Sequence, residues 1–403
     1  MNDNIYWVWL SRLSGIKPNA LMRYIERFAS AKRIYDSDET ELRQVVNSTL
    51  AEITALTRKD LSEAQTISEK CQKLGVRIIP LSDEKYPERL MNIYDPPIVL
   101  YVKGNIPDID KECTIGIVGT RKASQYGLTT AERLGYEVAE CGGLIISGLA
   151  EGIDSAAARG ALKASGRAVG VLGTGIDIVF PSQNERLFGD VESGGCLISE
   201  YPPGERATRY TFPARNRIIS GLSLGVCVVE APERSGSLIT ASRALEQGRD
   251  VFAVPGSIDL QSFKGSNSLL RDGAELVTCG WDIVSRHEWR FPGKIHEKKT
   301  LRKILSPERS RSASDNAPVT ASDNVRVAAS DAPATAMPAP VKKRPEGLSE
   351  NELKVLDAII GQSTADMITS KTDLRPEHVM VALTLLELKG LVKNRGNMTY
   401  ETN

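Results

Sequence analysis

Residues 113–120 read CTIGIVGT, and residues 124–141 read SQYGLTTAERLGYEVAEC. The first stretch is an apolar run of strand length, and the second has the apolar spacing of an amphipathic helix. Six further apolar runs lie around this pair: IVLYVKG (98–104), GLIISGLA (143–150), RAVGVLGTG (167–175), CLISEY (196–201), LGVCVVEAP (224–232) and DVFAVPG (250–256). Apolar strands separated by helices indicate a parallel sheet covered on both faces. Residues 76–285 are therefore predicted to form an α/β domain, a Rossmann-like, doubly wound and mostly parallel sheet.

The two segments that flank this domain differ from it in pattern. Residues 1–75 have helical apolar spacing without strand-like alternation, which predicts a small helical domain. Their Gly-Ile-Lys-Pro turn (15–18) is compatible with a helix-hairpin-helix and with a plain connector. Residues 286–347 carry nine Lys or Arg against three Asp or Glu over 286–311, and then become rich in Ala, Ser, Asp and Pro. That composition predicts a flexible linker.

Residues 348–403 recover a globular pattern. Ser349 and Glu352 have the spacing of a capping box at the start of a first helix. Two further helices are predicted over 365–372 and 376–389, and residues 391–401 resemble a hairpin. Three helices and a hairpin are the elements of a winged helix.

The composition of the 403-residue chain excludes several classes of protein. Lys plus Arg and Asp plus Glu both number 51, so nucleic-acid binding would require a local basic surface rather than an overall basic excess. The six cysteines have no metal-ligand spacing, so we expect no metal and no disulfide framework. The start of the chain does not resemble a signal peptide, and no run of about 18 apolar residues occurs. These features predict a cytoplasmic protein without a membrane anchor.

The loops that follow the predicted strands are rich in glycine, hydroxyl residues and arginine. In a doubly wound sheet, ligands bind at the carboxyl ends of the strands. Glycines let backbone N–H groups approach a ligand, helix N-termini favour anions, and arginine matches phosphate oxygens. A single such loop is compatible with a tight turn alone, but five on one edge favour a phosphate site. The dinucleotide fingerprint and the Walker pattern are both missing, so no cofactor is expected.

Residues 206–217, RATRYTFPARNR, indicate which phosphate ligand is bound. Four arginines alternate here with Tyr210 and Phe212. Single-stranded nucleic acid is bound by cations along its phosphates and by aromatic rings against its bases. Catalytic groups are sparse, because the α/β region has no histidine before 287 and the acids Glu200, Glu230 and Glu246 have no evident partner. Only Glu230, at the end of a strand, is placed for acid–base chemistry.

Five stretches resemble a known family in order and spacing. They are CTIGIVGTRKASQYG (113–127), IISGLAEGIDSAAARGAL (145–162), FPARNRIISGLS (212–223), VVEAPERSGSLITASRALEQGRDVFAVPG (228–256) and SNSLLRDGAELV (266–277). This pattern resembles the DNA-processing protein A (DprA/Smf) family. The resemblance implies a non-catalytic bacterial protein that binds single-stranded DNA and loads the RecA recombinase onto it during natural transformation. It also implies a homodimer through the Rossmann-like domain, a sterile-alpha-motif-like N-terminal domain and a winged helix of variable role.

The resemblance also assigns site residues. The family's Gly-Ser-Arg loop corresponds to 119–121, its Ser-Gly pair to 147–148, its basic-Asn-Arg patch to 215–217 and its Ser-Gly-Ser loop to 235–237. With the aromatic and basic segment, the expected DNA-contacting residues are Gly119, Thr120, Arg121, Ser124, Ser147, Gly148, Arg209, Tyr210, Phe212, Arg215, Asn216, Arg217, Ser235, Gly236, Ser237 and Thr240. Arg121, Arg215 and Arg217 are expected to neutralise phosphates. Loop N–H groups are expected to hold the DNA backbone, and Tyr210 or Phe212 to stack on bases.

Two other functions remain open at this point. Related Rossmann-like enzymes remove the base from nucleoside monophosphates, but their two adjacent glycines are missing from residues 232–240. A duplex-DNA regulator acting through the winged helix is the other alternative. Its presumed recognition helix over 376–389 has few of the Arg, Asn or Gln side chains that read the major groove.

Overall fold

The computed structural model describes residues 3–16, 18–298, 349–359, 363–372, 374, 376–389, 391–394 and 399–402. Contacts divide the chain into two compact units, Met1–Ser312 and Ala313–Asn403, and each is described by itself. The predicted linker over 299–347 lies outside the described residues.

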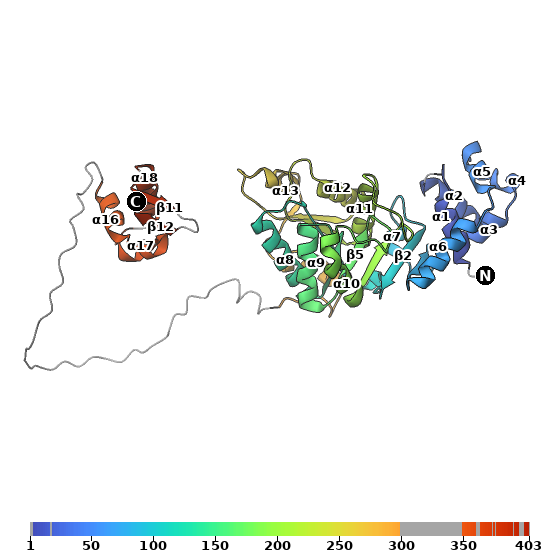
Figure 1. The fold of residues 1–403 in the computed structure, drawn as a ribbon, viewed down its shortest axis with the longest axis horizontal. Helices are drawn as coiled ribbons and strands as arrows, with labels where there is room; N and C mark the ends of the chain where they lie inside the picture. Colours follow the sequence, from blue (N-terminus) through green and yellow to red (C-terminus); the bar gives the residue numbers. More distant parts are fainter. Residues whose placement is uncertain are drawn as a thin grey trace, which may run out of the picture. The chain divides into compact units, whose positions relative to one another are not determined.

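A nine-stranded sheet forms the centre of the first unit (Figure 1). Its strands are β1 (Arg77–Pro80), β2 (Val99–Gly104), β3 (Cys113–Val118), β4 (Gly143–Ser147), β5 (Val169–Leu172), β6 (Cys196–Ser199), β7 (Gly225–Val228), β8 (Asp250–Ala253) and β9 (Glu275–Leu276). The spatial order is β1-β2-β6-β5-β4-β3-β7-β8-β9. Strand β2 pairs antiparallel with both β1 and β6, and all other neighbouring strands pair parallel. All seven predicted strands are confirmed, and β1 and β9 are additional.

Helices cover both faces of this sheet, as predicted (Figure 1). One group is α8 (Gln125–Glu140), α9 (Ile153–Ser165) and α10 (Glu185–Gly194); the other is α11 (Thr211–Leu222), α12 (Gly236–Glu246) and α13 (Lys264–Arg271). The chain moves from β3 to β4, β5 and β6 in one direction, and then returns to β7 on the other side of β3. Right-handed crossovers in opposite directions place the two helix groups on opposite faces. The strand order therefore reverses at β3, which is where doubly wound folds bind ligands.

The N-terminal helices share the core of the sheet. They are α1 (Asn4–Arg12), α2 (Pro18–Phe28), α3 (Ala31–Asp36), α4 (Glu39–Leu42), α5 (Leu50–Leu56) and α6 (Ser62–Lys73), with the short α7 (Glu88–Met91) following β1. Helix α1 packs on β1 and β2, and one continuous cluster of buried side chains runs from Ile5 to Ile295. The regular elements described within residues 1–75 are therefore all helices, as predicted, but they are packed into the same unit as the sheet.

The packed part of the first unit extends beyond residue 285, where the linker was predicted to begin. Helix α14 (Gly280–Val284) and the 3-10 helix η4 (Ser285–Arg290) follow β9, and Phe291 and Ile295 are buried in the main core. The three other 3-10 turns of this unit are η1 (Ile109–Lys111), η2 (Ser182–Asn184) and η3 (Gln261–Phe263). Residues 286–298, expected at the start of the linker, are thus held against the first unit by Phe291 and Ile295.

The second unit contains the predicted helices and hairpin strands. They are α16 (Glu350–Ala358), α17 (Ala365–Lys371), α18 (Pro376–Leu388), β11 (Val392–Asn394) and β12 (Thr399–Thr402), with a further short strand β10 (Ser363–Thr364). The three strands form an antiparallel sheet in the order β10-β12-β11. The predicted capping box is confirmed, because Ser349 N–H donates to Glu352 Oε2 at 2.8 Å and Ser349 Oγ accepts from Glu352 N–H at 3.4 Å.

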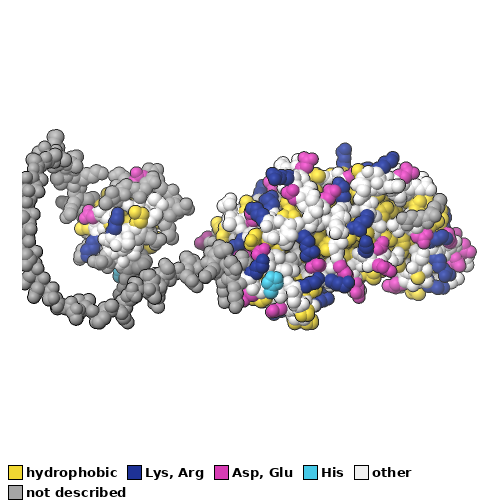
Figure 2. All heavy atoms as spheres, turned by 90° about the horizontal axis from the view of Figure 1, so that it is seen from below, with side chains coloured by type: hydrophobic (Ala, Val, Ile, Leu, Met, Phe, Trp, Pro, Cys, Tyr) yellow, Lys and Arg dark blue, Asp and Glu magenta, His cyan; other side chains and the backbone are white. Residues whose placement is uncertain are grey.

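Charged side chains are mixed on the surface of the first unit. On the face drawn in Figure 2, Lys and Arg alternate with Asp and Glu, in agreement with their equal numbers. Any attraction for an anion must therefore come from a local cluster. Among the residues that the structure describes, no helix is long and apolar enough to cross a membrane.

Candidate nucleic-acid interface

A pocket of about 420 Å³ lies at the carboxyl ends of β3, β4 and β7, beside the first half of α11. It is lined by Val118, Gly119, Thr120, Arg121, Ala150, Asp154, Arg209, Phe212, Pro213, Arg215, Asn216, Ile219, Pro232, Arg234, Ser235, Gly236, Ser237, Ile239 and Thr240. Eleven of the sixteen residues expected to contact DNA are in this lining; Ser124, Ser147, Gly148, Tyr210 and Arg217 are not. The pocket occupies the point where the strand order reverses.

Arginine dominates the charge of the pocket. Arg121, Arg209, Arg215 and Arg234 line it, whereas Asp154 is its single carboxylate. None of the four arginines forms an ion pair with another described residue. Sequence reasoning missed Arg234, although it immediately precedes the Ser-Gly-Ser loop. Four unpaired guanidinium groups around one acid create the local positive potential that the whole chain lacks.

Aromatic rings form one wall beside these cations. The guanidinium carbon of Arg121 lies 4.9 Å from the centroid of the Phe212 ring, and the Phe180 ring centroid is 5.4 Å from the same ring. Phe180 is 43% exposed and lines a second hollow of about 80 Å³, which shares Arg121, Phe212 and Arg215 with the pocket. Gly148 also lines this smaller hollow. Phe180 was not predicted, and its position before Pro181 in a loop after β5 gave no aromatic-basic spacing.

Tyr210 lies outside the pocket. It is 67% exposed, its ring centroid is 4.6 Å from the guanidinium carbon of Arg209, and its hydroxyl accepts a hydrogen bond from Arg209. Tyr210 is therefore accessible to a longer ligand that extends past Arg209.

Arg215 is the buried cation of the pocket. Its side chain is 3% exposed, and its Nε and Nη1 atoms have no hydrogen-bond partner among the described residues. Burial lowers the pKa of Arg215 to about 10, against the opposing influence of Asp154. Its space depends on Gly148, where a Cβ would lie only 1.6 Å from Arg215 Nη1. A buried guanidinium with unsatisfied donors is costly, so its retention here favours an anion-binding role.

Several expected backbone donors are already used within the protein. Gly148 N–H donates to Asp154 Oδ2 at 3.1 Å, and Thr120 N–H donates to the carbonyl of Glu230 at 2.8 Å. Ser147 is fully buried, and its hydroxyl donates to the carbonyl of Asp154. These groups shape the loops rather than offer donors to a ligand. Burial raises the pKa of Asp154 to about 6, against the stabilising influence of Arg215 and of the N–H groups of Gly148 and Gly119.

Other backbone donors remain available. No described group accepts a hydrogen bond from the N–H groups of Arg121, Ser235 or Gly236. Ser235 caps α12, where its Oγ accepts from Ser237 N–H at 3.3 Å, and Thr240 is in the next turn of that helix. Asn216 donates its side-chain amide to the carbonyl of Gly236 at 3.4 Å, which connects α11 to this cap. The start of α12 therefore presents free N–H groups to the pocket.

Ser124 and Glu230 support the loop after β3. Ser124 caps α8, its N–H and Oγ both donate to Glu230 Oε2, at 3.0 and 2.7 Å, and Glu230 is fully buried. The one predicted acid–base candidate is thus engaged with a helix cap. Glu200 and Glu246 are paired with Arg217 and Arg243.

The structure does not bring Arg217 to the pocket. This residue is 8% exposed and forms ion pairs at 2.7 Å with both Asp95 and Glu200. The two carboxylates raise the pKa of Arg217 even though burial opposes its charge. Positions 215 and 217 are separated by about 200° around α11, since each residue of a helix turns by about 100°. Arg215 faces the pocket, and Arg217 holds α11 to the loops that carry Asp95 and Glu200.

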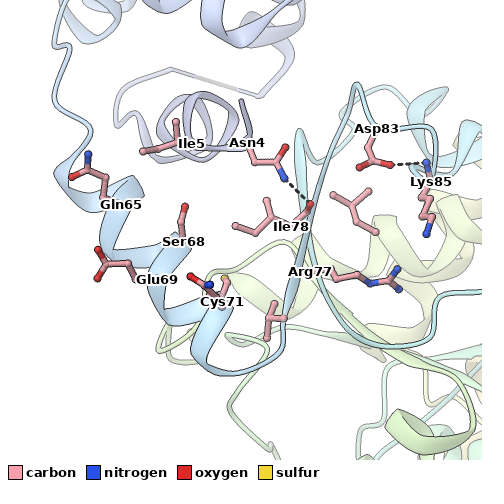
Figure 3. Close-up of a pocket in the computed structure, with 13 residues that line it drawn as sticks. Asn4, Ile5, Gln65, Ser68, Glu69, Cys71, Arg77, Ile78, Asp83 and Lys85 are labelled. Atoms are coloured by element: carbon pink, nitrogen blue, oxygen red, sulfur yellow. Dashed lines mark hydrogen bonds between the residues drawn. The ribbon is translucent and has the colours of Figure 1, made fainter. Parts of the chain in front are cut away.

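A larger hollow of about 730 Å³ lies between the N-terminal helices and the edge strand β1 (Figure 3). Asn4 donates its amide to the carbonyl of Ile78 at 3.2 Å there, which partly covers the strand edge. The charged residues that line it are of both signs: Glu69, Arg77, Asp83 and Lys85. This mixture gives it no preference for an anion. No cluster of metal-ligating side chains occurs in the described parts of the chain.

Comparison with known proteins identifies the family of this chain. Residues 77–288 match the family described as DNA recombination-mediator protein A. Protein Smf of Synechocystis is 34% identical over 406 residues, covering 99% of each chain. The crystal structure of DNA processing protein A from Streptococcus pneumoniae is 36% identical and has a TM-score of 0.62, covering 70% of this chain and 97% of that one. A DNA processing protein A from Helicobacter pylori that binds single-stranded DNA is 26% identical, with a TM-score of 0.49, covering 55% and 97%. The chain belongs to the DNA recombination-mediator protein A family, the DprA/Smf proteins.

Proposed function

We propose that this protein binds single-stranded DNA in the arginine-rich pocket at the carboxyl ends of β3, β4 and β7. The observation that carries the proposal is the combination of four unpaired arginines with an aromatic wall of Phe212 and Phe180. Phosphates are held by Arg121, Arg215 and their neighbours and by the free N–H groups at the start of α12. Bases stack on the exposed rings. Arg217 has no direct role, because its guanidinium is committed to two carboxylates.

We further propose that the protein delivers the bound strand to the RecA recombinase during homologous recombination, including the recombination of DNA taken up by natural transformation. Membership of a recombination-mediator family supports this role. In this proposal it acts in the cytoplasm as a homodimer through its Rossmann-like domain, and it makes and breaks no bond. The second unit is proposed to be a winged helix that binds another protein or binds DNA weakly. Its helix α18 exposes Val381, Thr384 and Leu385 instead of a row of cations.

The test is fluorescence anisotropy with labelled oligonucleotides, single-stranded against duplex, over a series of salt concentrations. We expect tight single-strand binding and weak duplex binding, with a log–log salt slope of about −0.7 for each phosphate contacted. Arg121→Ala should weaken binding to every sequence and reduce the slope by about 0.7. Arg243→Ala is the matched control, since Arg243 is on the same domain but pairs with Glu246 at the surface.

Three results would count against the proposal. Preference for duplex DNA would move the function to the second unit. Hydrolysis of a nucleoside monophosphate without DNA binding would favour the enzymatic alternative. An Arg121→Ala protein with unchanged affinity and salt slope would remove Arg121 from the interface.

A further inference from the structure

The single carboxylate of the pocket has an unusual position. Asp154 is 6% exposed and is the second residue of α9. Its Oδ2 accepts the N–H of Gly148 at 3.1 Å, and the N–H of Gly119 also favours its charged form. Glycine loops and helix N-termini are the places where proteins bind phosphate. Here the protein's own carboxylate takes donors that a phosphate would otherwise use.

Asp154 and Arg215 approach each other at Gly148 without touching. A Cβ at position 148 would lie 1.6 Å from Arg215 Nη1 and 2.6 Å from Asp154 Oδ2, yet no hydrogen bond or ion pair joins the two side chains. Asp154 therefore balances the buried guanidinium by its charge while leaving Nε and Nη1 unsatisfied. The other charged or titratable groups around this pair are Arg121, which acts on both, Tyr201, which acts on Arg215, Arg209 and Arg234 along the pocket, and Glu151 beside the smaller hollow.

We propose that Asp154 is a resident anion of this pocket, which balances Arg215 in the absence of DNA and takes up a proton from solvent when a DNA phosphate binds beside Arg215. The proposal rests on the proposed function. Its physical reason is that keeping two negative groups ionised in one buried site costs free energy, because the two charges repel each other. Protonation of Asp154 removes this repulsion and leaves the charge of Arg215 to the phosphate.

The expected pH dependence has a definite sign. Burial raises the pKa of Asp154 to about 6 in the free protein, so the carboxylate is charged at neutral pH but close to its midpoint. A nearby phosphate raises this pKa further. The protonated form therefore binds more tightly, and the affinity for single-stranded DNA increases as the pH falls from 8 towards 6 and levels off below the pKa of the free protein.

The experiment measures binding of oligothymidylate, whose bases do not titrate in this range. Anisotropy at constant ionic strength between pH 5.5 and 8.5 should show affinity rising, by at most about tenfold per pH unit for one linked proton. Calorimetry at pH 7 in two buffers of different ionisation enthalpy should show net proton uptake by the wild-type protein. Asp154→Asn should bind with little pH dependence and more tightly than wild type at pH 8, by about five- to tenfold.

Glu151→Gln is the matched control, because it removes a nearby exposed carboxylate and should retain the proton uptake. If Asp154→Asn does not fold, the proton uptake measured by calorimetry on the wild-type protein tests the proposal by itself. Tight binding of oligothymidylate without proton uptake would overturn the role of Asp154 and leave the proposed function intact. Failure to bind oligothymidylate at every pH would overturn both.

Discussion

The guanidinium of Arg121 lies over the ring of Phe212, with 4.9 Å between its central carbon and the ring centroid. Arg121 follows β3, whereas Phe212 is in the first turn of α11, so this pair exists only when the two elements are docked. We expect Phe212→Leu to weaken single-strand binding by about 1–3 kcal/mol, the range for the loss of one base stack. Anisotropy at fixed salt measures the change.

Tyr210→Leu serves as the comparison for that prediction. Tyr210 is exposed and outside the pocket, so its replacement should have a smaller effect on a short oligonucleotide. A larger loss for Tyr210→Leu than for Phe212→Leu would mean that the strand runs over Arg209 rather than through the pocket.

Gly148→Ala should weaken DNA binding by displacing Arg215. The added Cβ would lie 1.6 Å from Arg215 Nη1, so the guanidinium must move. Gly236→Ala is a close control, since Gly236 lines the same pocket but a Cβ there meets nothing within 4 Å. Anisotropy and thermal unfolding of both variants should show lost affinity for Gly148→Ala alone. Equal affinities for the two variants would contradict the proposed role of Arg215.

Arg217→Met should reduce stability rather than DNA contacts. It leaves Asp95 and Glu200, whose side chains are 34% and 24% exposed, without the buried guanidinium that they share, for which a loss of about 1–3 kcal/mol is expected. Arg243→Met, at an exposed pair, should cost less than about 1 kcal/mol. Urea unfolding gives both values. The salt slope of DNA binding should be unchanged in Arg217→Met, and a reduction of about 0.7 would instead assign Arg217 a phosphate contact.

The second unit should lose stability at low pH through Glu352. Lys389 and the N–H and hydroxyl of Ser349 lower the pKa of Glu352 to about 2. A carboxyl whose pKa is depressed by folding contributes stability above its unfolded pKa of about 4.5 and loses that contribution as the pH falls towards 2. Hydrogen exchange in α16 of the full chain, normalised for intrinsic rates, should be faster in Glu352→Gln than in wild type at pH 6. This difference should disappear near pH 2, and its persistence there would show that charge is not the cause.

The sheet could be predicted from sequence because buried parallel strands are continuous apolar runs. The strands that were missed, β1 and β9, lie at the two edges of the sheet, where burial is less complete. The capping box of Ser349 and Glu352 was predictable because it depends on local spacing alone.

The site was less predictable, because the direction of each side chain depends on tertiary packing. Arg215 and Arg217 are the same residue type in the same short segment. Only the helical angle between them indicates that they face different surroundings. Asp154 was not predicted, although its place in the first turn of α9 is a usual position for an acid that accepts loop N–H groups. Phe180 and Arg234 reach the pocket from loops whose course the sequence does not specify.

The reversal of strand order at β3 has a consequence for synthesis of the protein. β3 pairs with β4 soon after both are made, but its other neighbour is β7, at Gly225–Val228. The wall that carries Arg234 and the cap of α12 comes later still. A nascent chain on the ribosome therefore has no DNA pocket until about residue 240 has emerged, so a growing polypeptide cannot capture a DNA strand before β7 and the start of α12 are in place beside β3.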